Sequence, residues 1–432
     1  MNSAESTVPT PPGRIDYIDL AKGFACLAIM YGHAVAPSVD RLFLVENVIF
    51  TSVWFSAPLF FFASGMNVVT FFEKNAGKAG FRMTIFYLLS ALILIMLSVC
   101  FSVNRGSLRI PNIFQGIAMG TAFTFVLIRL RLPNWALAAI SLLIYIPWVF
   151  FWEAQLPAIE AIRSLPFTEE PEPTFRQWID HVPVIWRAFG LHFSFLPWTS
   201  YVLVGAAAFR SVRNNPATAI RWAVFFLLVM LAAIPAALAP RWSSQVLLQQ
   251  HFSDMMARNT PFFFLLWYAQ CGLFFLALNR WYRGAVTMKE GVIKRAFTFT
   301  EFLGRQSFLF LVWHWVFLSI LIIVGKFIEQ SVRFGSIHPV HYIPWLTCTL
   351  LIVLTMRWIT GVGERWRASP GFLWQASLVL VIFTFPGLAA FIRRGYTPFL
   401  TTFFSFPACL AFAFMYPELR FRLRRKLTRS AA

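Results

Sequence analysis

Apolar runs separated by short polar stretches recur along the whole 432-residue chain. About 20 mostly apolar residues are enough for a helix to cross the hydrocarbon core of a bilayer. Twelve segments approach this length, and the fourth is short and contains Gln115. Their spans are 18–38, 47–72, 83–102, 111–128, 134–152, 190–209, 219–239, 260–279, 306–325, 340–356, 372–392 and 397–416. The pattern predicts an all-α fold, a polytopic integral membrane bundle of about 10–12 transmembrane helices.

Polar stretches divide the chain into three parts: a disordered N-terminal tail at 1–13, a transmembrane domain at 14–418 and a basic cytoplasmic tail at 419–432. The first apolar stretch contains Lys22 and His33 and lacks a small-residue cleavage site, so it does not resemble a cleavable signal peptide. The longest stretch without a predicted helix is 153–189, which is rich in acidic residues. Loops of this length are uncommon unless they are functional or disordered. We expect it on the side opposite the cytoplasm.

Composition and charge support a membrane protein and give its orientation. Apolar residues make up 58% and charged residues 13%, whereas soluble domains contain about 45–50% and about 25%. A net charge of +19 by itself suggests nucleic-acid binding. With the N-terminus in the cytoplasm, however, most of the 37 Lys and Arg residues fall at cytoplasmic helix ends and loops, as the positive-inside rule requires. The charge therefore predicts cytoplasmic N- and C-termini and no nucleic-acid partner. We expect the membrane to be the bacterial inner membrane.

Ionisable residues inside the apolar segments are the candidates for function, because a charged group within a membrane is costly. Lys22 and His33 are eleven residues apart, which is about three helical turns, so both lie on one helix face about 16 Å apart. Asp19 precedes Lys22 by three residues and is close enough to pair with it. His314 lies in the ninth segment. Two intramembrane histidines indicate proton transfer, since imidazole titrates near neutral pH.

Each of these residues also has a simpler explanation. Lys22 can extend its ammonium to the cytoplasmic lipid headgroups. His33 can be a buried histidine with a backbone partner or can line a transport pathway, and His314 can be a packing residue between Trp313 and Trp315. The five cysteines form no CxxC or His/Cys pattern, so buried thiols are predicted instead of a zinc site or disulfides. No metal is expected.

Five segments, in order, resemble motifs of the polytopic membrane acyltransferases, in particular the heparan-alpha-glucosaminide N-acetyltransferase-like and acyltransferase-3 branches. They are RIDYIDLAKGFACLAIMYGH, FSAPLFFFASGMN, RIPNIFQGIAMGTAF, FLPWTSYVLVGAAAFR and LGRQSFLFLVWHWVFL. Together they run from Arg14 to Arg210 and again from 303 to 318. The His of the family's first helix corresponds to His33. Its Arg corresponds to Lys22, a departure that keeps the charge but loses the planar guanidinium fork.

The resemblance implies transfer of an acyl group, with acetyl as the default, from acyl-CoA to a hydroxyl or amine of a glycan or glycolipid. His33 is then the expected general base, and His314 orients the acceptor or shares the proton transfer. A basic cytoplasmic face suits the donor's phosphates, and Lys22, Lys78 and Arg82 are the candidate donor-binding residues. Membrane lipids are further expected partners.

Two other classes of protein fit parts of the pattern. A polytopic transporter or flippase for a glycan or lipid-linked substrate also carries intramembrane His and Lys, but it predicts related halves with broken helices at the midplane. A noncatalytic membrane partner predicts solid packing around His33 and His314.

Overall fold

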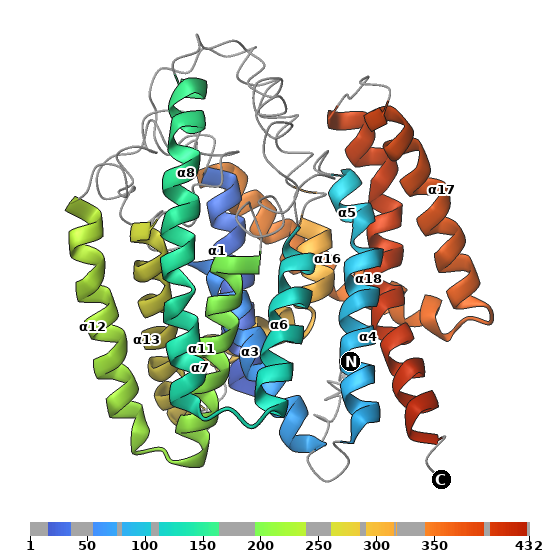
Figure 1. Cartoon of the computed structure of the whole chain (residues 1–432). Helices are drawn as coiled ribbons and strands as arrows, with labels where there is room; N and C mark the ends of the chain where they lie inside the picture. The colour runs from blue at the N-terminus through green and yellow to red at the C-terminus, as the bar shows by residue number, and fades with distance from the viewer. Residues whose placement is uncertain are drawn as a thin grey trace.

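The computed structural model describes residues 16–35, 55–75, 80–104, 112–163, 195–238, 261–285, 291–314, 317, 342–392 and 398–429. Within these ranges the regular structure is helical, which confirms the predicted all-α fold (Figure 1). The predicted tail at 1–13 and most of the predicted loop at 153–189 lie outside the described residues.

Every predicted apolar segment contains a helix. Eleven of them correspond to α1 (Asp16–Val35), α3 (Ser56–Lys74), α4 (Phe81–Leu97) with α5 (Val99–Asn104), α6 (Ile113–Arg129), α7 (Asn134–Leu143) with α8 (Tyr145–Arg163), α11 (Phe195–Asn214), α12 (Thr218–Leu238), α13 (Pro261–Ala285), α16 (Tyr342–Ala368), α17 (Phe372–Ile392) and α18 (Pro398–Arg429). The ninth corresponds to the helical segment 307–314.

The helix boundaries differ from the predicted ones in several places, of which three bear on the site. Helix α8 continues to Arg163, so the beginning of the stretch predicted to lack a helix is helical. Helix α14 (Val292–Arg305) lies in a stretch where charged residues gave no apolar run. Helix α16 extends to Ala368 and is followed, after a turn with Gly371 at φ +74°, by α17 at a bend of 118°.

Four helices are long and apolar enough to cross a membrane, and a fifth span is added if the bent pair of α16 and α17 is counted as one. The four are Phe81–Phe101, Asn134–Ala154, Thr218–Ala236 and Pro261–Tyr282. These numbers cover only the described residues, so the predicted total of spans stays a prediction. By helix length and hydropathy, the chain is a candidate multi-pass integral membrane protein.

The outward face of α12 is suited to contact with lipid. Leu227, Leu228, Leu231 and Ile234 all project from this helix and are exposed. An apolar row of this length would be unfavourable in water, whereas it matches hydrocarbon. The inner side of α12 packs on α13 through the buried Phe226, whose ring lies 6.1 Å from that of Tyr268.

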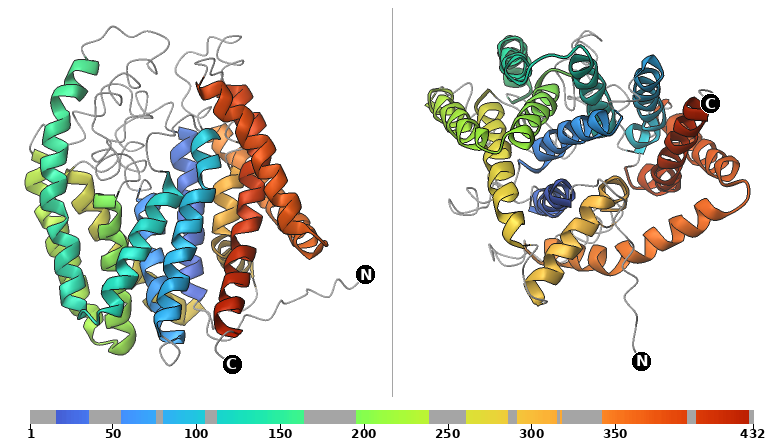
Figure 2. Two further views of the ribbon diagram at one scale, coloured as in Figure 1. Left: turned by 45° about the vertical axis from the view of Figure 1, so that its right-hand side comes forward. Right: turned by 90° about the horizontal axis from the view of Figure 1, so that it is seen from below.

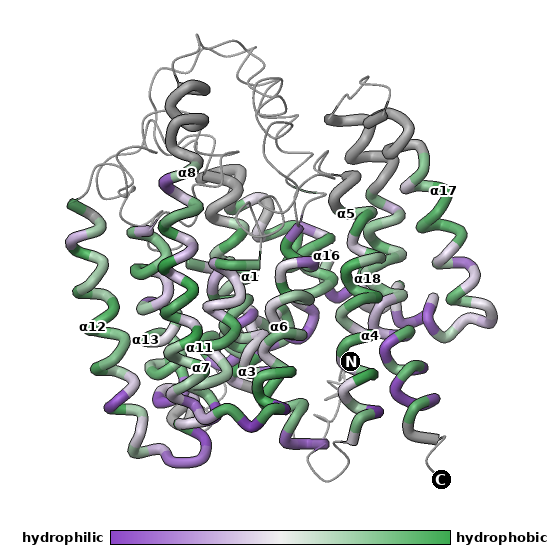
Figure 3. Tube along the Cα trace, viewed as in Figure 1, coloured by the Kyte–Doolittle hydropathy of each residue, from purple (hydrophilic) through white to green (hydrophobic). Residues whose placement is uncertain are grey.

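Hydrophilic residues gather at one end of the bundle, the lower end in Figure 3. Helices α3, α6 and α11 finish there, and α7 and α12 start there (Figure 1). The ring of Tyr17, at the start of α1, lies 6.2 Å from the ring of Phe209 and 6.0 Å from that of Tyr282, measured between ring centroids. Phe209 and Tyr282 are near the ends of α11 and α13. We call this the basic end, because its helix termini carry Lys74, Arg129, Arg210, Arg213, Arg221 and Arg280. These are residues for which the sequence predicts a shared side of the membrane.

Gln115, the polar residue that interrupts the fourth predicted span, serves helix formation. Its Oε1 accepts a hydrogen bond from the backbone N–H of Asn112 at 3.0 Å, and the Asn112 side chain accepts from the N–H of Gln115 at 3.0 Å. This capping box satisfies donors at the start of α6 that have no partner within the helix. Asn112 also donates to the carbonyl oxygen of Ser98 at 2.9 Å, which ties α6 to the break between α4 and α5.

Candidate functional site

Helix α1 lies at the centre of the bundle, where it contacts α3, α13, α14 and α16 (Figure 2, right). Near its start, Lys22 Nζ is 2.6 Å from Asp19 Oδ1, and the exposed fractions of the two side chains are 14% and 5%. The predicted pairing of Asp19 with Lys22 is therefore present. The ammonium of Lys22 lies against this carboxylate, and its extension to lipid headgroups stays an alternative prediction. Burying these two charges is costly, and their mutual attraction offsets that cost.

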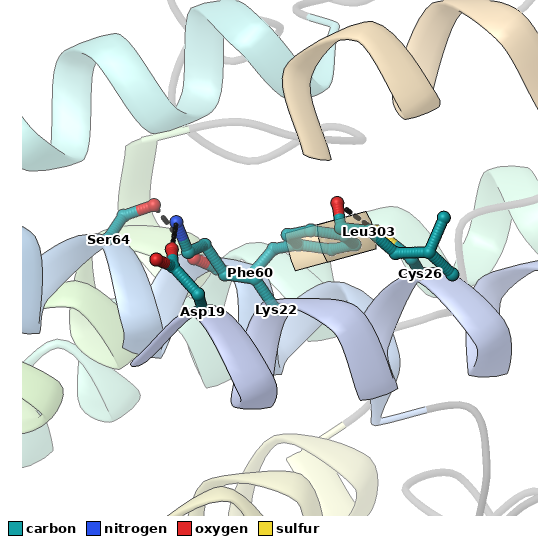
Figure 4. A network of polar contacts seen from close by, with 6 residues as sticks. All are labelled: Asp19, Lys22, Cys26, Phe60, Ser64 and Leu303. Carbon is teal, nitrogen blue, oxygen red and sulfur yellow. Dashed lines mark hydrogen bonds and ion pairs between the residues drawn. The ribbon is translucent and has the colours of Figure 1, made fainter. Parts of the chain in front are cut away.

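Two glycines allow α14 to approach the backbone of α1 beside this ion pair. A Cβ atom built on Gly304 would overlap the carbonyl oxygen of Asp19, and one built on Gly23 would overlap the carbonyl oxygen of Thr300. Small residues at helix crossings in membranes permit such close backbone contact. One turn further along α1, Cys26 Sγ is 3.9 Å from the carbonyl oxygen of Leu303 (Figure 4). The glycines of two motifs quoted above are therefore packing positions.

Helix α3 lies on another side of the ion pair. Ser64 Oγ donates to the carbonyl oxygen of Phe60 at 2.7 Å, and its side chain points toward the Asp19–Lys22 pair in Figure 4. The neighbouring Gly65 packs against the backbone of Val202, so α3 and α11 are in close backbone contact here. Ser64 lies near the candidate site, but the sequence predicted no role for it because it lies within an apolar run.

The end of α14 adds further charges. Arg305 Nη2 is 3.7 Å from Glu301 Oε2, and both side chains are partly buried. Arg305 directly follows Gly304, the residue that touches α1. Arg357 of α16 places its guanidinium carbon 6.0 Å from the centre of the Phe302 ring, as in a cation–π contact. Lys22 and Arg305 each have a carboxylate partner, whereas Arg357 is exposed on α16.

His314 is buried, with 1% of its surface exposed. Its Nδ1 lies 2.9 Å from the carbonyl oxygen of Phe310, and its ring stacks on that of Phe310 with 5.1 Å between centroids. The neighbouring Trp313 points elsewhere: its Nε1 donates to Thr355 Oγ1 of α16 at 2.9 Å. The imidazole is therefore oriented by the turn that precedes it.

The structure describes the other predicted site residues to different extents. His33 belongs to α1, but its side chain lies outside the described part, and so does Lys78. Convergence of His33 with His314 consequently stays a prediction. Arg82 is exposed at the start of α4. Helix α4 packs on α6 and α18 at the edge of the bundle, with α3 between it and α1 (Figure 2, right). Arg82 and Lys22 therefore belong to separate parts of the molecule.

Cysteine side chains in the described ranges are free thiols in packed surroundings. Cys26, Cys100, Cys271 and Cys409 are all buried, as the sequence predicts. In the same ranges, no three His, Cys, Asp or Glu residues gather in a group suited to a metal ion.

Comparison with known proteins gives no family assignment: the chain matches no protein-family model and no curated protein. What the sequence and the fold establish is a helical protein with several candidate membrane spans.

Proposed function

We propose that the protein is an integral membrane acyltransferase, which moves an acyl group from acyl-CoA to a hydroxyl or amine of a glycan or glycolipid. The supporting observation is the burial of the Asp19–Lys22 pair on the central helix of the bundle, 2.6 Å apart. Ionisable groups in the interior of a membrane bundle are retained at a cost and mark sites of function by default. His33 lies eleven residues beyond Lys22 on the same helix, in the direction away from the basic end.

The proposed reaction needs a base and a place for the donor. His33 accepts the proton of the acceptor hydroxyl or amine while that atom attacks the thioester carbonyl. The carbon–sulfur bond then breaks, and the CoA thiolate takes up the proton from the imidazolium. His314, oriented through Nδ1 by Phe310, positions the acceptor or shares this proton. The donor's phosphates bind at the basic end, where Lys78 and Arg82 are the candidate groups. Lys22, paired with Asp19 inside the bundle, is a separate candidate for contact with the donor.

The orientation of the bundle is part of the same proposal. Acyl-CoA is made in the cytoplasm, so the basic end faces the cytoplasm, as the positive-inside rule also favours. The N- and C-termini then lie in the cytoplasm of a bacterial cell, and the membrane is the inner membrane. An acceptor on the opposite side would meet the acyl group through the interior of the bundle, along α1.

Comparative mass spectrometry of glycans and lipids tests this proposal in cells with and without the gene. We expect the deletion strain to lose an acyl mass from one glycan or glycolipid, and the wild-type gene to restore it. The His314→Phe variant, which keeps an aromatic ring against Phe310 but removes both ring nitrogens, should not restore it. Loss of the whole glycan from the cell surface, with no acyl difference, would instead indicate a transporter or flippase.

A further inference from the structure

Helices α1 and α13 lie beside each other and run in opposite directions. The ring centroids of Tyr17 and Tyr282 are 6.0 Å apart, and those of Phe24 and Phe274 are 5.6 Å apart. Seven residues forward along α1 therefore correspond to eight residues back along α13. The turns of α13 that precede Phe274 consequently lie beside the part of α1 that leads toward His33.

Two polar atoms on this side of α13 lack partners. Gln270 and Trp267 precede Phe274 by four and seven residues, so all three residues share one side of the helix. Trp267 is 1% exposed, and Gln270 is half-buried. In the described part of the chain, neither Trp267 Nε1 nor Gln270 Oε1 has a hydrogen-bond partner, although both atoms are buried. A donor and an acceptor one turn apart are thus left unsatisfied.

The surroundings of these two atoms are apolar. The Trp267 ring stacks on that of Phe263, with 4.8 Å between centroids and 17° between planes, and Phe274 packs on Phe24 at the other end of the row. A buried water typically makes about three hydrogen bonds, whereas these two atoms provide only two. Leaving a buried donor or acceptor unpaired is costly. A ligand with one acceptor and one donor between apolar groups would satisfy both atoms.

We propose that Trp267 and Gln270 bind an amide of the pantetheine arm of acyl-CoA. The N–H of Trp267 donates to the amide oxygen, and Gln270 Oε1 accepts from the amide N–H. This inference rests on the proposed function and extends the donor site from the basic end into the bundle. A sugar hydroxyl also donates and accepts. A sugar ring carries several such groups, however, whereas α13 has only these two unpaired atoms among its described side chains.

The place of the pair along α1 agrees with the place of the proposed base. From the contact of Phe24 with Phe274, Trp267 is level with residue 31 of α1. His33 is therefore about 3 Å further along the helix axis. The last amide of the pantetheine arm is joined to the CoA sulfur by a two-carbon link. An amide held by Trp267 and Gln270 thus brings the thioester to the level of His33.

Binding of unacylated CoA to the full chain in nanodiscs tests the pair without requiring transfer. Trp267→Phe keeps an aromatic ring against Phe263 but removes the N–H, and Gln270→Leu removes the carboxamide. Each variant should weaken CoA binding about tenfold, which is about 1.4 kcal/mol. Neither should change the binding of the adenosine bisphosphate portion of CoA, which lacks the arm. Equal weakening of both ligands would overturn the assignment to the arm.

Thermal unfolding separates a binding role from a packing role. Removing an unsatisfied buried polar atom relieves its desolvation penalty, so Trp267→Phe and Gln270→Leu should unfold at or above the wild-type midpoint without CoA. Saturating CoA should raise the midpoint of wild type more than a fixed, limiting CoA concentration raises that of either variant. Lower midpoints without CoA, together with unchanged CoA affinity, would overturn the inference and indicate that the two side chains only stabilise the fold.

A second tryptophan–glutamine pair provides the matched control. Trp366 Nε1 donates to Gln375 Oε1 at 2.9 Å, so these two groups already satisfy each other. We expect Trp366→Phe to keep a CoA affinity within twofold of wild type. Equal losses of affinity in Trp366→Phe and Trp267→Phe would overturn the inference, because they would reflect a general effect of the substitution.

Failure of this inference and failure of the proposed function give different results. CoA binding that depends on Trp267 and Gln270, without any acyl transfer, would leave the pair standing and refute the transferase. Acyl transfer with an unchanged KM for acyl-CoA and a raised KM for the acceptor in both variants would leave the transferase standing. That result would overturn the inference and assign the pair to the acceptor.

Discussion

The pair of Asp19 and Lys22 is the feature on which the functional account depends at the scale of single residues. Removing one member of a buried ion pair leaves the other charge without compensation, whereas removing both often costs little. The sequence predicts this pair from a spacing of three residues, and the structure adds that it faces the interior. His314 is similar: its place within an apolar run is visible in the sequence, but its backbone partner Phe310 and its burial are not.

Neutralising only the carboxylate should therefore destabilise the fold. We expect Asp19→Asn to lose about 3–5 kcal/mol of stability, seen as a lower midpoint of thermal unfolding followed by tryptophan fluorescence in detergent. The double variant Asp19→Asn/Lys22→Met should recover most of this loss, yet it should be inactive in acyl transfer if the ammonium belongs to the site.

Glu418→Gln is the control for that experiment, because it breaks an ion pair with the exposed Arg422. Pairs of that kind contribute about 0–1 kcal/mol. If Asp19→Asn unfolds at the same temperature as Glu418→Gln, the pair on α1 does not have the buried, energetically coupled character assigned to it.

At the scale of helices, α14 explains motif residues that the sequence alone could not interpret. Its charged residues Lys294, Arg295 and Glu301 hid it from a search for apolar runs, although its apolar residues recur with helical spacing. Gly304 closes the contact with α1 and so sets where Arg305 and the following segment 307–314 begin. A glycine needed for backbone contact between distant segments has no local signature, so its role could not be predicted before the partner helix was known.

Enlarging Gly304 should separate α14 from α1. A Cβ atom there would overlap the backbone of Asp19, so we expect Gly304→Ala to cost about 1–3 kcal/mol, as overpacked sites do. Gly361→Ala in α16 is the matched control: a Cβ atom on Gly361 meets nothing within 4 Å, and alanine has the higher helix propensity, worth up to about 1 kcal/mol. The midpoints of thermal unfolding of the two variants test this prediction. Equal midpoints would contradict the close contact between α14 and α1 at Gly304.

At the scale of the whole molecule, the sequence predicts the approximate positions of the apolar helices along the chain better than it predicts which helices pack against one another. Alternating directions along the chain place the basic residues of α3, α6 and α11 at one end, as the charge pattern indicates. By contrast, the contact between Arg424 and Asn75 joins positions 349 residues apart, and no local pattern encodes it. The central position of α1 is likewise visible only in the folded bundle. Because of this position, the charges of Asp19 and Lys22 are in the interior.

Acyl transfer by the purified protein tests the central claim most directly. Wild type and His33→Ala are placed in nanodiscs with acetyl-CoA labelled in its acetyl group, together with the acceptor that loses an acyl mass in the deletion strain. The label recovered in the acceptor is then measured. We predict transfer by wild type and a loss of at least about 100-fold in His33→Ala, the range expected for removal of a general base. Transfer at the wild-type rate by His33→Ala would contradict the role of α1 in catalysis, and no transfer by wild type would contradict the proposed activity itself.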